Sequence, residues 1–385
     1  MRKLLLFSLL LFVVHTTTKG EQLIVEMTTN KEVGSTISFQ VSLANTGTTL
    51  NVDFGDGSKV PFTDKISISG TVAGNAIKIY GEPTDLVDFW CYGDGLATLD
   101  VSNNTALEAL NCFNNNLSSL DVSNNTALER LDCDKNNLSS LDVSVNTALE
   151  ALHCYNNNLS SLDVSNITAL KKLGCGKNNL SSLDVSNNKA LIWLSCNNNN
   201  LSFSSLPQEG LGLTTFTYAP QSDILINNIV QVNTSVDLSA EREVDGNTTT
   251  FVWKNESGDN LVEGTDYTIA NGVTTFLKLQ PQKVYCEMTN PLFPDLTLKT
   301  TLAEVSNTTG VDEFKEDGFN VFSANRTIIV DTSNNGLLSV VDMSGKVIVQ
   351  KNINPGRTEI PVAKEGVYIV SLINQQKCSK KIIVK

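Results

Sequence analysis

Apolar residues recur along the middle of the chain in a pattern that repeats every 21 residues. The segments between residues 86 and 201 are LVDFWCYGDGL, LEALNCFNNNL, LERLDCDKNNL, LEALHCYNNNL, LKKLGCGKNNL and LIWLSCNNNNL. Between them, variants of SSLDVSNNTA supply a second set of apolar residues, such as Leu120 and Val122. One such unit cannot bury its apolar side alone, so stacked neighbours must form the core. The pattern predicts a solenoid of stacked coils.

Strand geometry assigns the side chains of each unit to two faces. Because successive side chains alternate, Leu110 and Cys112 point inward, while Asn111 and Phe113 point outward. The cysteines that share this inward place are Cys91, Cys112, Cys133, Cys154, Cys175 and Cys196. Their stacked Cβ atoms would stand ~4.8 Å apart, beyond the ~3.8 Å typical of a disulfide. We predict buried structural thiols, and metal binding or redox chemistry are the less favoured alternatives.

An asparagine lies three residues after five of these cysteines, where the chain leaves the strand. These residues are Asn115, Asn136, Asn157, Asn178 and Asn199. A buried amide both donates and accepts, so it can satisfy backbone groups that the turn leaves unpaired. The first unit has Asp94 instead, which suits a repeat at the edge of the array.

The repeated segments fit the pattern LxxLxLxxNxL of leucine-rich repeats, with cysteine in the third apolar place. Over residues 86 to 201 they resemble the internalin-type leucine-rich repeats of bacteria, internalin J in particular. The resemblance implies a curved solenoid whose concave parallel sheet binds a partner, often a molecule on a host or neighbouring cell. It does not identify that partner.

Residues 1 to 20 have the features of a secretory signal peptide. A basic start precedes an apolar run from Leu4 to Val14, and small polar residues follow. The run is shorter than the ~20 residues that a transmembrane helix needs, and no later segment is long enough. We therefore expect an exported protein without a transmembrane segment.

The rest of the chain is also predicted to be mainly β. Residues 21 to 85 contain alternating runs and the turn VDFGDGS, which resembles the PKD-domain signature, and we interpret them as a β-rich cap. Residues 86 to 220 hold the leucine-rich repeats and their C-terminal flank. Residues 221 to 310 resemble an immunoglobulin-like β-sandwich, with Trp253 on one strand and Cys286 on another. No cysteine lies near Val236, so we expect Cys286 to be an unpaired core thiol, and Tyr285 is misplaced for a tyrosine corner.

Residues 311 to 385 resemble the C-terminal sorting domain of the type IX secretion system, built as a small β-sandwich. The matching residues are Gly366, Tyr368, Lys380, Lys381 and Lys385. Residues 325 to 385 carry nine Lys or Arg and four Asp or Glu, which gives +5 on an otherwise acidic chain. The resemblance implies passage through the secretion machinery and a protein that is secreted or attached to the outer membrane at the cell surface.

Composition narrows the function further. The formal net charge is −13, and it becomes −16 once Arg2, Lys3 and Lys19 leave with the signal peptide. Nucleic-acid binding relies on clustered Lys and Arg, so we expect no nucleic-acid partner. Without the leader, which holds His15, the chain has one histidine, His153, so a metal centre with several histidines is disfavoured. We expect no cofactor.

The outward places of the repeat strands form the candidate binding surface on the concave face. We single out Trp90, Tyr92, Phe113, Asp132, Asp134, His153 and Tyr155. The last two strands offer only small polar residues beside their cysteines, which predicts a patch centred on the second to fourth strands. Aromatic rings can anchor a protein or stack on sugars, and carboxylates add polar contacts. The alternative is that the rings mainly stabilise the sheet.

We therefore predict an internalin-like adhesin that recognises a protein or glycan on host or neighbouring bacterial cells. A passive component of the surface layer or of a biofilm is a second interpretation. Glycan hydrolysis by Asp132 and Asp134 is a third, and it is disfavoured because an open sheet would neither exclude water nor raise the pKa of a carboxyl. We expect a protein that is not an enzyme.

Overall fold

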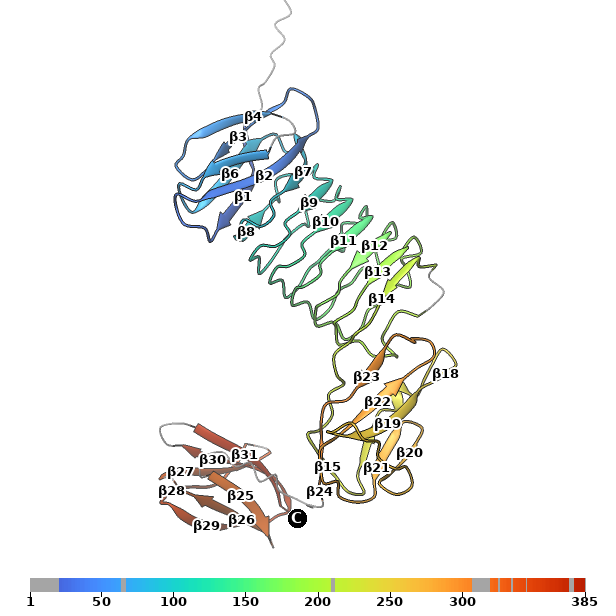
Figure 1. Ribbon diagram of the computed structural model, residues 1–385. Helices are drawn as coiled ribbons and strands as arrows, with labels where there is room; N and C mark the ends of the chain where they lie inside the picture. The colour runs from blue at the N-terminus through green and yellow to red at the C-terminus, as the bar shows by residue number, and fades with distance from the viewer. Residues whose placement is uncertain are drawn as a thin grey trace, which may run out of the picture.

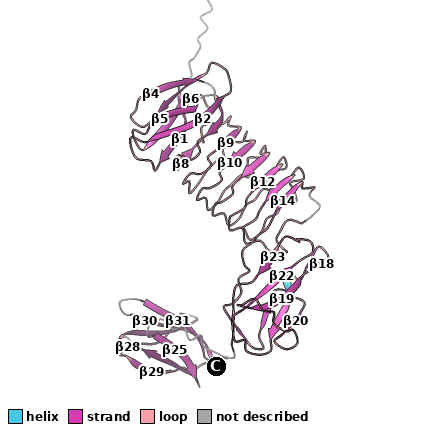
Figure 2. Ribbon diagram, viewed as in Figure 1, coloured by secondary structure: helices cyan, strands magenta, loops and turns pink. Residues whose placement is uncertain are grey.

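The computed structural model describes residues 21–63, 67–208, 212–306, 319–324, 326–333, 335–343, 345–373 and 377–384. The signal peptide and Lys385 lie outside the described residues, as do the side chains of Lys380 and Lys381. The described part is almost entirely β, with one short 3-10 helix, η1 (Ser239–Glu241) (Figure 2). It contains no helix with the length and apolar character needed to cross a bilayer. The predicted mainly-β fold with a repeat solenoid is confirmed.

The N-terminal cap is built on two sheets, and both sheets continue into the first repeat. Its strands are β1 (Gln22–Thr29), β2 (Thr36–Leu43), β3 (Thr49–Asp53), β4 (Lys59–Thr63), β5 (Ser67–Thr71) and β6 (Ala76–Gly81). One sheet has the order β4-β3-β6-β1-β8, where β8 (Leu96–Asp100) belongs to the first coil. In the other sheet, β2 pairs with β7 (Leu86–Trp90) of the same coil. The cap thus covers the apolar end of the solenoid, and the rings of Phe39 and Phe89 meet there at 5.6 Å.

The solenoid strands form one parallel ladder (Figure 1). They are β7, β9 (Ala109–Asn111), β10 (Arg130–Asp132), β11 (Ala151–His153), β12 (Lys172–Gly174), β13 (Trp193–Ser195) and β14 (Thr215–Thr217). Together with β2 and β5 they make a nine-stranded sheet. All six cysteines of the repeat column are buried free thiols, as the inward register requires. Burial raises the pKa of each thiol, for Cys196 to about 12.

The asparagine that lies three residues after each of the last five repeat cysteines joins adjacent coils. Asn157 Nδ2 donates to the carbonyl of Cys133 in the preceding coil (3.0 Å) and of Cys154 in its own (3.2 Å), and Asn157 Oδ1 accepts from Leu138 N (3.0 Å). The same contacts recur for Asn115, Asn136, Asn178 and Asn199. These buried amides therefore form a hydrogen-bonded ladder along the solenoid.

The two ends of this ladder are closed by different residues. At the cap, Asp94 is buried and pairs with Lys31 (Nζ–Oδ1 2.5 Å), while its backbone N–H donates to Asn115 Oδ1. At the other end, Gln221 takes the place of an asparagine, because its Nε2 donates to the Cys196 carbonyl (3.0 Å) and its Oε1 accepts from Asn199 N. Each end thus satisfies backbone groups that the array would leave open.

A second buried asparagine ladder runs along the other wall of the coils. Asn125 Nδ2 donates to the carbonyls of Val101 and Asn104, and Asn146 and Asn188 repeat these contacts. Ile167 occupies the equivalent position in the coil between Asn146 and Asn188 and is fully buried. This second ladder was not predicted from the sequence.

An immunoglobulin-like module follows the solenoid. Its strands are β15 (Ile229–Gln231), β16 (Ser235–Asp237), β17 (Glu243–Val244), β18 (Asn247–Thr248), β19 (Thr250–Asn255), β20 (Tyr267–Ala270), β21 (Val273–Phe276), β22 (Val284–Thr289), β23 (Thr297–Lys299) and β24 (Glu304–Ser306). Trp253 is fully buried, meets Phe276 edge-on at 4.8 Å and donates from Nε1 to Thr274 Oγ1 (2.9 Å). Cys286 is a buried free thiol opposite Trp253. The half-buried Tyr285 ring lies near Lys299 Nζ instead of forming a corner.

The solenoid and the immunoglobulin-like module share one continuous core. Phe293 of the module meets Tyr218 at 5.4 Å and Phe203 at 6.0 Å, both from the flank of the last coil. The buried Glu241 accepts from Ser204 N and Ser204 Oγ. The boundary predicted at residue 220 therefore falls inside a packed junction.

The C-terminal module is a small sandwich with its own core. Its sheets have the orders β25-β26-β29 and β28-β27-β30-β31. The strands are β25 (Phe319–Ala324), β26 (Thr327–Thr332), β27 (Gly336–Asp342), β28 (Val347–Ile353), β29 (Gly356–Pro361), β30 (Gly366–Ile373) and β31 (Lys377–Val384). Gly366 begins β30, and the buried Tyr368 donates from its hydroxyl to the Lys364 carbonyl (2.7 Å). Lys380 and Lys381 lie on β31.

Candidate functional site

The solvent-facing side chains of β7 and β9 to β14, and of the two residues after each strand, form a surface that we call the repeat-strand face. Parallel pairing sets Trp90 beside Asn111, Asn111 beside Asp132, and Asp132 beside His153. The ladder continues past the strand ends, because Asn114 N donates to the Asp134 carbonyl (2.9 Å). The seven predicted binding residues therefore lie on one face: Trp90, Tyr92, Phe113, Asp132, Asp134, His153 and Tyr155.

The predicted aromatic residues on this face differ in exposure. Trp90 is 40% exposed and Tyr92 is 50% exposed, while Phe113, His153 and Tyr155 are half-buried. The ring of Phe113 lies 5.0 Å from Lys135 Nζ, a cation–π contact at the rim of the face. The first strand therefore presents the rings that are most available to a partner.

Trp193 belongs to the same face and was missed by the sequence analysis. It lies on β13, paired with Lys172 on β12, and its ring centre is 5.6 Å from that of His153. The predicted binding residues are the immediate neighbours of the cysteines. Trp193 lies three residues before Cys196, and the alternation of side chains along a strand directs it outward as well. The expected decline of the patch toward small polar residues is therefore wrong, since an indole fills the far end.

Two glycines let these aromatic side chains approach one another. A Cβ on Gly174 would stand 3.0 Å from His153 Nδ1 and 3.3 Å from a Trp193 ring carbon. A Cβ on Gly176 would stand 2.7 Å from Asn197 Oδ1 and 3.2 Å from the Tyr155 ring. The side chains of the coils on either side thus close over these two glycines, while the exposed Lys172 on β12 lies beside Trp193.

Two carboxylates, Asp132 at the end of β10 and Asp134 just after it, are held by hydrogen bonds and are partly removed from water. Asp132 accepts from Asp134 N (3.1 Å) and from Asn111 Nδ2 (3.3 Å), and Asp134 accepts from Tyr155 N. Burial, and then the neighbouring Asp132 charge, raise the pKa of Asp134 to about 7, and burial also raises the pKa of Asp132. Burial lowers the pKa of His153. The expectation that nothing would raise a carboxyl pKa on this face is wrong.

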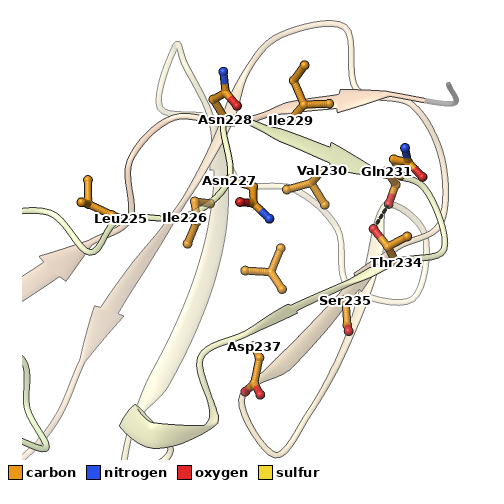
Figure 3. A pocket seen from close by; sticks show the side chains of 11 residues that line it. Leu225, Ile226, Asn227, Asn228, Ile229, Val230, Gln231, Thr234, Ser235 and Asp237 are labelled. Carbon is orange, nitrogen blue, oxygen red and sulfur yellow. Dashed lines mark hydrogen bonds between the residues drawn. The ribbon is translucent and has the colours of Figure 1, made fainter. Parts of the chain in front are cut away.

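The described residues offer no metal centre on this face. Among them, no group of three or more His, Cys, Asp or Glu side chains is placed to hold a metal ion. A hollow of about 620 Å³ lies elsewhere, in the immunoglobulin-like module between β15 and β16 (Figure 3). Its lining includes Leu225, Asn228, Gln231 and Thr234, and Thr234 Oγ1 donates to the Gln231 carbonyl. None of the predicted binding residues lines it.

Parts of the chain are similar to known proteins. Residues 323–385 match the secretion system C-terminal sorting domain. No curated protein matches the chain. Among solved structures, the chain is similar to the functional domain of InlJ from Listeria monocytogenes, which includes a cysteine ladder, at 19% identity and a TM-score of 0.33. That similarity covers 57% of this chain and 62% of the InlJ chain, so this chain spans less than two thirds of its length.

Two further solved structures are similar to parts of the chain. A leucine-rich repeat protein from Leptospira interrogans is 22% identical, with a TM-score of 0.28, over 31% of this chain and 33% of that chain. Immunoglobulin domains 1–5 of Sidekick-1 are 12% identical, with a TM-score of 0.14, over 45% of this chain and 40% of that chain.

The sorting-domain match agrees with the resemblance predicted for the C-terminal residues. It indicates type IX secretion to the cell surface or the extracellular space. The chain is therefore a secreted or surface protein that carries a leucine-rich repeat solenoid.

Proposed function

We propose that the repeat-strand face is an adhesive surface that binds a protein or glycan on a host cell or a neighbouring bacterium. The observation that supports this proposal is the set of aromatic rings and carboxylates that lie on the repeat-strand face and do not pack in the hydrophobic core. His153 and Trp193 close over Gly174, Tyr155 lies against Gly176, and Asp132 and Asp134 lie in the neighbouring coil. In this proposal the chain binds its partner and performs no catalysis.

The scaffold supports binding because it holds these side chains in fixed register. Each strand of the ladder is hydrogen-bonded to both neighbours, and the coils behind it are joined by the asparagine ladder. Side chains on such a framework lose little conformational freedom when a partner docks. Trp and Tyr are also the residues that most often anchor protein interfaces, and their flat rings stack on sugars.

The test measures binding of the full exported chain to intact cells. Purified protein is incubated with neighbouring bacteria and with cultured host cells, and the bound fraction is titrated. The double variant His153→Ala/Trp193→Ala is expected to weaken binding at least tenfold. Val145→Ala, which removes an exposed apolar side chain from the turn region of the coil, is the matched control. If the double variant and the control bound cells equally well, the proposal that this face is the adhesive surface would be refuted.

Glycan hydrolysis is a second candidate because one specific observation favours it. A carboxyl group with a pKa near 7 beside a second carboxyl group is the pairing that glycosidases use for acid and base. This candidate predicts the release of reducing ends from a polysaccharide by the intact chain, and loss of that release in Asp134→Asn. A passive structural component, the third interpretation, predicts neither binding nor turnover, only altered clustering of cells that lack the protein.

A further inference from the structure

The repeat-strand face does not end at the first repeat. Strand β7 pairs with β2 of the cap, which sets Trp90 beside Gln40. Strand β2 pairs in turn with β5, which sets Gln40 beside Ser67. Residues paired directly across an antiparallel sheet share a face. Phe39, Val41 and Ile68 are buried, so their neighbours along β2 and β5 point to the side that carries Trp90.

The added surface is chemically uniform. Its side chains carry hydroxyl or amide groups and no charge: Ser38, Gln40, Ser42, Ser67, Ser69 and Thr71. The nearby cation Lys31 is already paired with Asp94 and also donates to the Thr36 carbonyl. On the adjoining strand β7, the half-buried Asp88 lies beside Ser42 on the same face. The surface therefore offers many uncharged hydrogen-bonding groups together with one carboxylate.

Two exposed rings border this uncharged surface. Trp90 lies at the end of β7 and Tyr92 lies just beyond it, with 40% and 50% of their surfaces exposed. Within the described part of the chain, neither ring is stacked on another aromatic side chain. Exposed large rings that the fold does not use are free to contact a ligand.

We infer that the cap end of this face, formed by β5, β2 and β7, binds an uncharged polysaccharide. The chain of sugars would stack its apolar C–H faces on Trp90 and Tyr92 and exchange hydrogen bonds with the hydroxyl and amide side chains of β2 and β5. The inference rests on the proposed function, because it names the ligand class for one end of the proposed adhesive surface.

The composition of the surface favours a sugar over a protein. Serine is depleted in protein interfaces, and serine and threonine are under-represented among the residues that dominate their binding energy. Protein interfaces also favour Met and Arg, and neither occurs among the outward residues of β2 and β5. A neutral polyol presents hydroxyl groups that match these uncharged donors and acceptors, and its hydroxyls can also donate to the carboxylate of Asp88.

The experiment is affinity electrophoresis of the full exported chain in native gels. The gels contain dextran, yeast mannan or hydroxyethyl cellulose as neutral polysaccharides, or alginate as an acidic one. At least one neutral polysaccharide is expected to slow migration. Trp90→Ala/Tyr92→Ala is expected to reduce the association constant at least tenfold.

Charge substitutions on the hydroxyl surface provide an independent test that keeps the rings in place. Ser38→Glu/Ser69→Glu is expected to weaken binding at least tenfold, since both positions are exposed and the longer, acceptor-only side chains would remove two hydroxyl donors and hold the sugar away from the sheet. Thr49→Glu is the control, because Thr49 is also exposed but lies on β3 in the other cap sheet. It should change the constant less than twofold.

Several results would overturn the inference. One is normal migration in all three neutral polysaccharides, and another is retardation that survives both double variants. Binding to cells that depends on Trp193 but not on Trp90 or Ser38 would also overturn it, while leaving the proposed function intact. Loss of cell binding in His153→Ala/Trp193→Ala with retained binding to a neutral polysaccharide would support both.

Discussion

The asparagine ladder yields the sharpest stability prediction, and Asn157 is the position to test. Its amide makes three buried hydrogen bonds, to the carbonyls of Cys133 and Cys154 and from Leu138 N. Asn157→Ala removes all three bonds at once. Neighbouring asparagines still donate to the two carbonyls after this substitution, but none accepts from Leu138 N. This difference sets the size of the loss in stability.

Each cysteine carbonyl keeps one donor after the substitution. Asn136 still donates to the Cys133 carbonyl (3.1 Å), and Asn178 still donates to the Cys154 carbonyl (2.9 Å). Leu138 N has no such second partner in the described contacts and would be left buried and unpaired. Two lost bonds at about 1 kcal/mol each, and an orphaned N–H at about 1 to 3 kcal/mol, give a loss of about 3 to 5 kcal/mol.

Urea unfolding of the full chain, followed by far-ultraviolet circular dichroism, measures this loss. Asn158→Ala is the control, because Asn158 is the exposed neighbour of Asn157, and it should cost less than about 0.5 kcal/mol. If Asn157→Ala and Asn158→Ala unfolded at the same urea concentration, the ladder would contribute nothing, and the account of how coils are joined would be refuted.

Three further predictions concern pH, thiols and export. The folded pKa of Asp134, about 7, lies above its unfolded value of about 4, so this residue should make the folded state less stable as pH rises between those values. A pKa shift of about 3 units corresponds to roughly 4 kcal/mol of unfolding free energy, or about 2 kcal/mol after allowance for screening by solvent. Urea unfolding at pH 4 and pH 8 should show that Asp134→Asn loses this pH dependence. Equal changes in stability between the two pH values for the variant and the unsubstituted protein would contradict the prediction. The thiols of the six repeat cysteines and of Cys286 should react with iodoacetamide only after denaturation. Mass spectrometry that found these thiols alkylated in the native protein would contradict their burial. Deletion of residues 323–385 should retain the protein in the periplasm, as cell fractionation would show, and normal release of the truncated chain would argue against the sorting role.

Much of the fold could be predicted from the sequence because the repeat samples one position many times. A single cysteine in a strand says little, but a cysteine every 21 residues from Cys91 to Cys196 determines the inward register of the strands. The same repetition placed Asn157 and its equivalents at buried turns. Local alternation then assigned Phe113, Asp132 and Tyr155 to the outward face, where the structure places them.

Tertiary structure alone decided how neighbouring side chains combine across strands. Trp193 and His153 are 40 residues apart in sequence, and only the pairing of β11, β12 and β13, with Gly174 between them, brings their rings to 5.6 Å. The raised pKa of Asp134 likewise depends mainly on its burial in the folded chain, which no local pattern encodes.

The extent of the candidate surface was also decided in three dimensions. The alternating runs of residues 21 to 85 predicted strands, but they did not reveal which strand would pair with the first repeat. The antiparallel pairing of β2 with β7 joins the hydroxyl side chains of the cap to Trp90 in one sheet. A strand's own sequence sets which side chains share a face, whereas its neighbours in a sheet are selected by packing between distant segments.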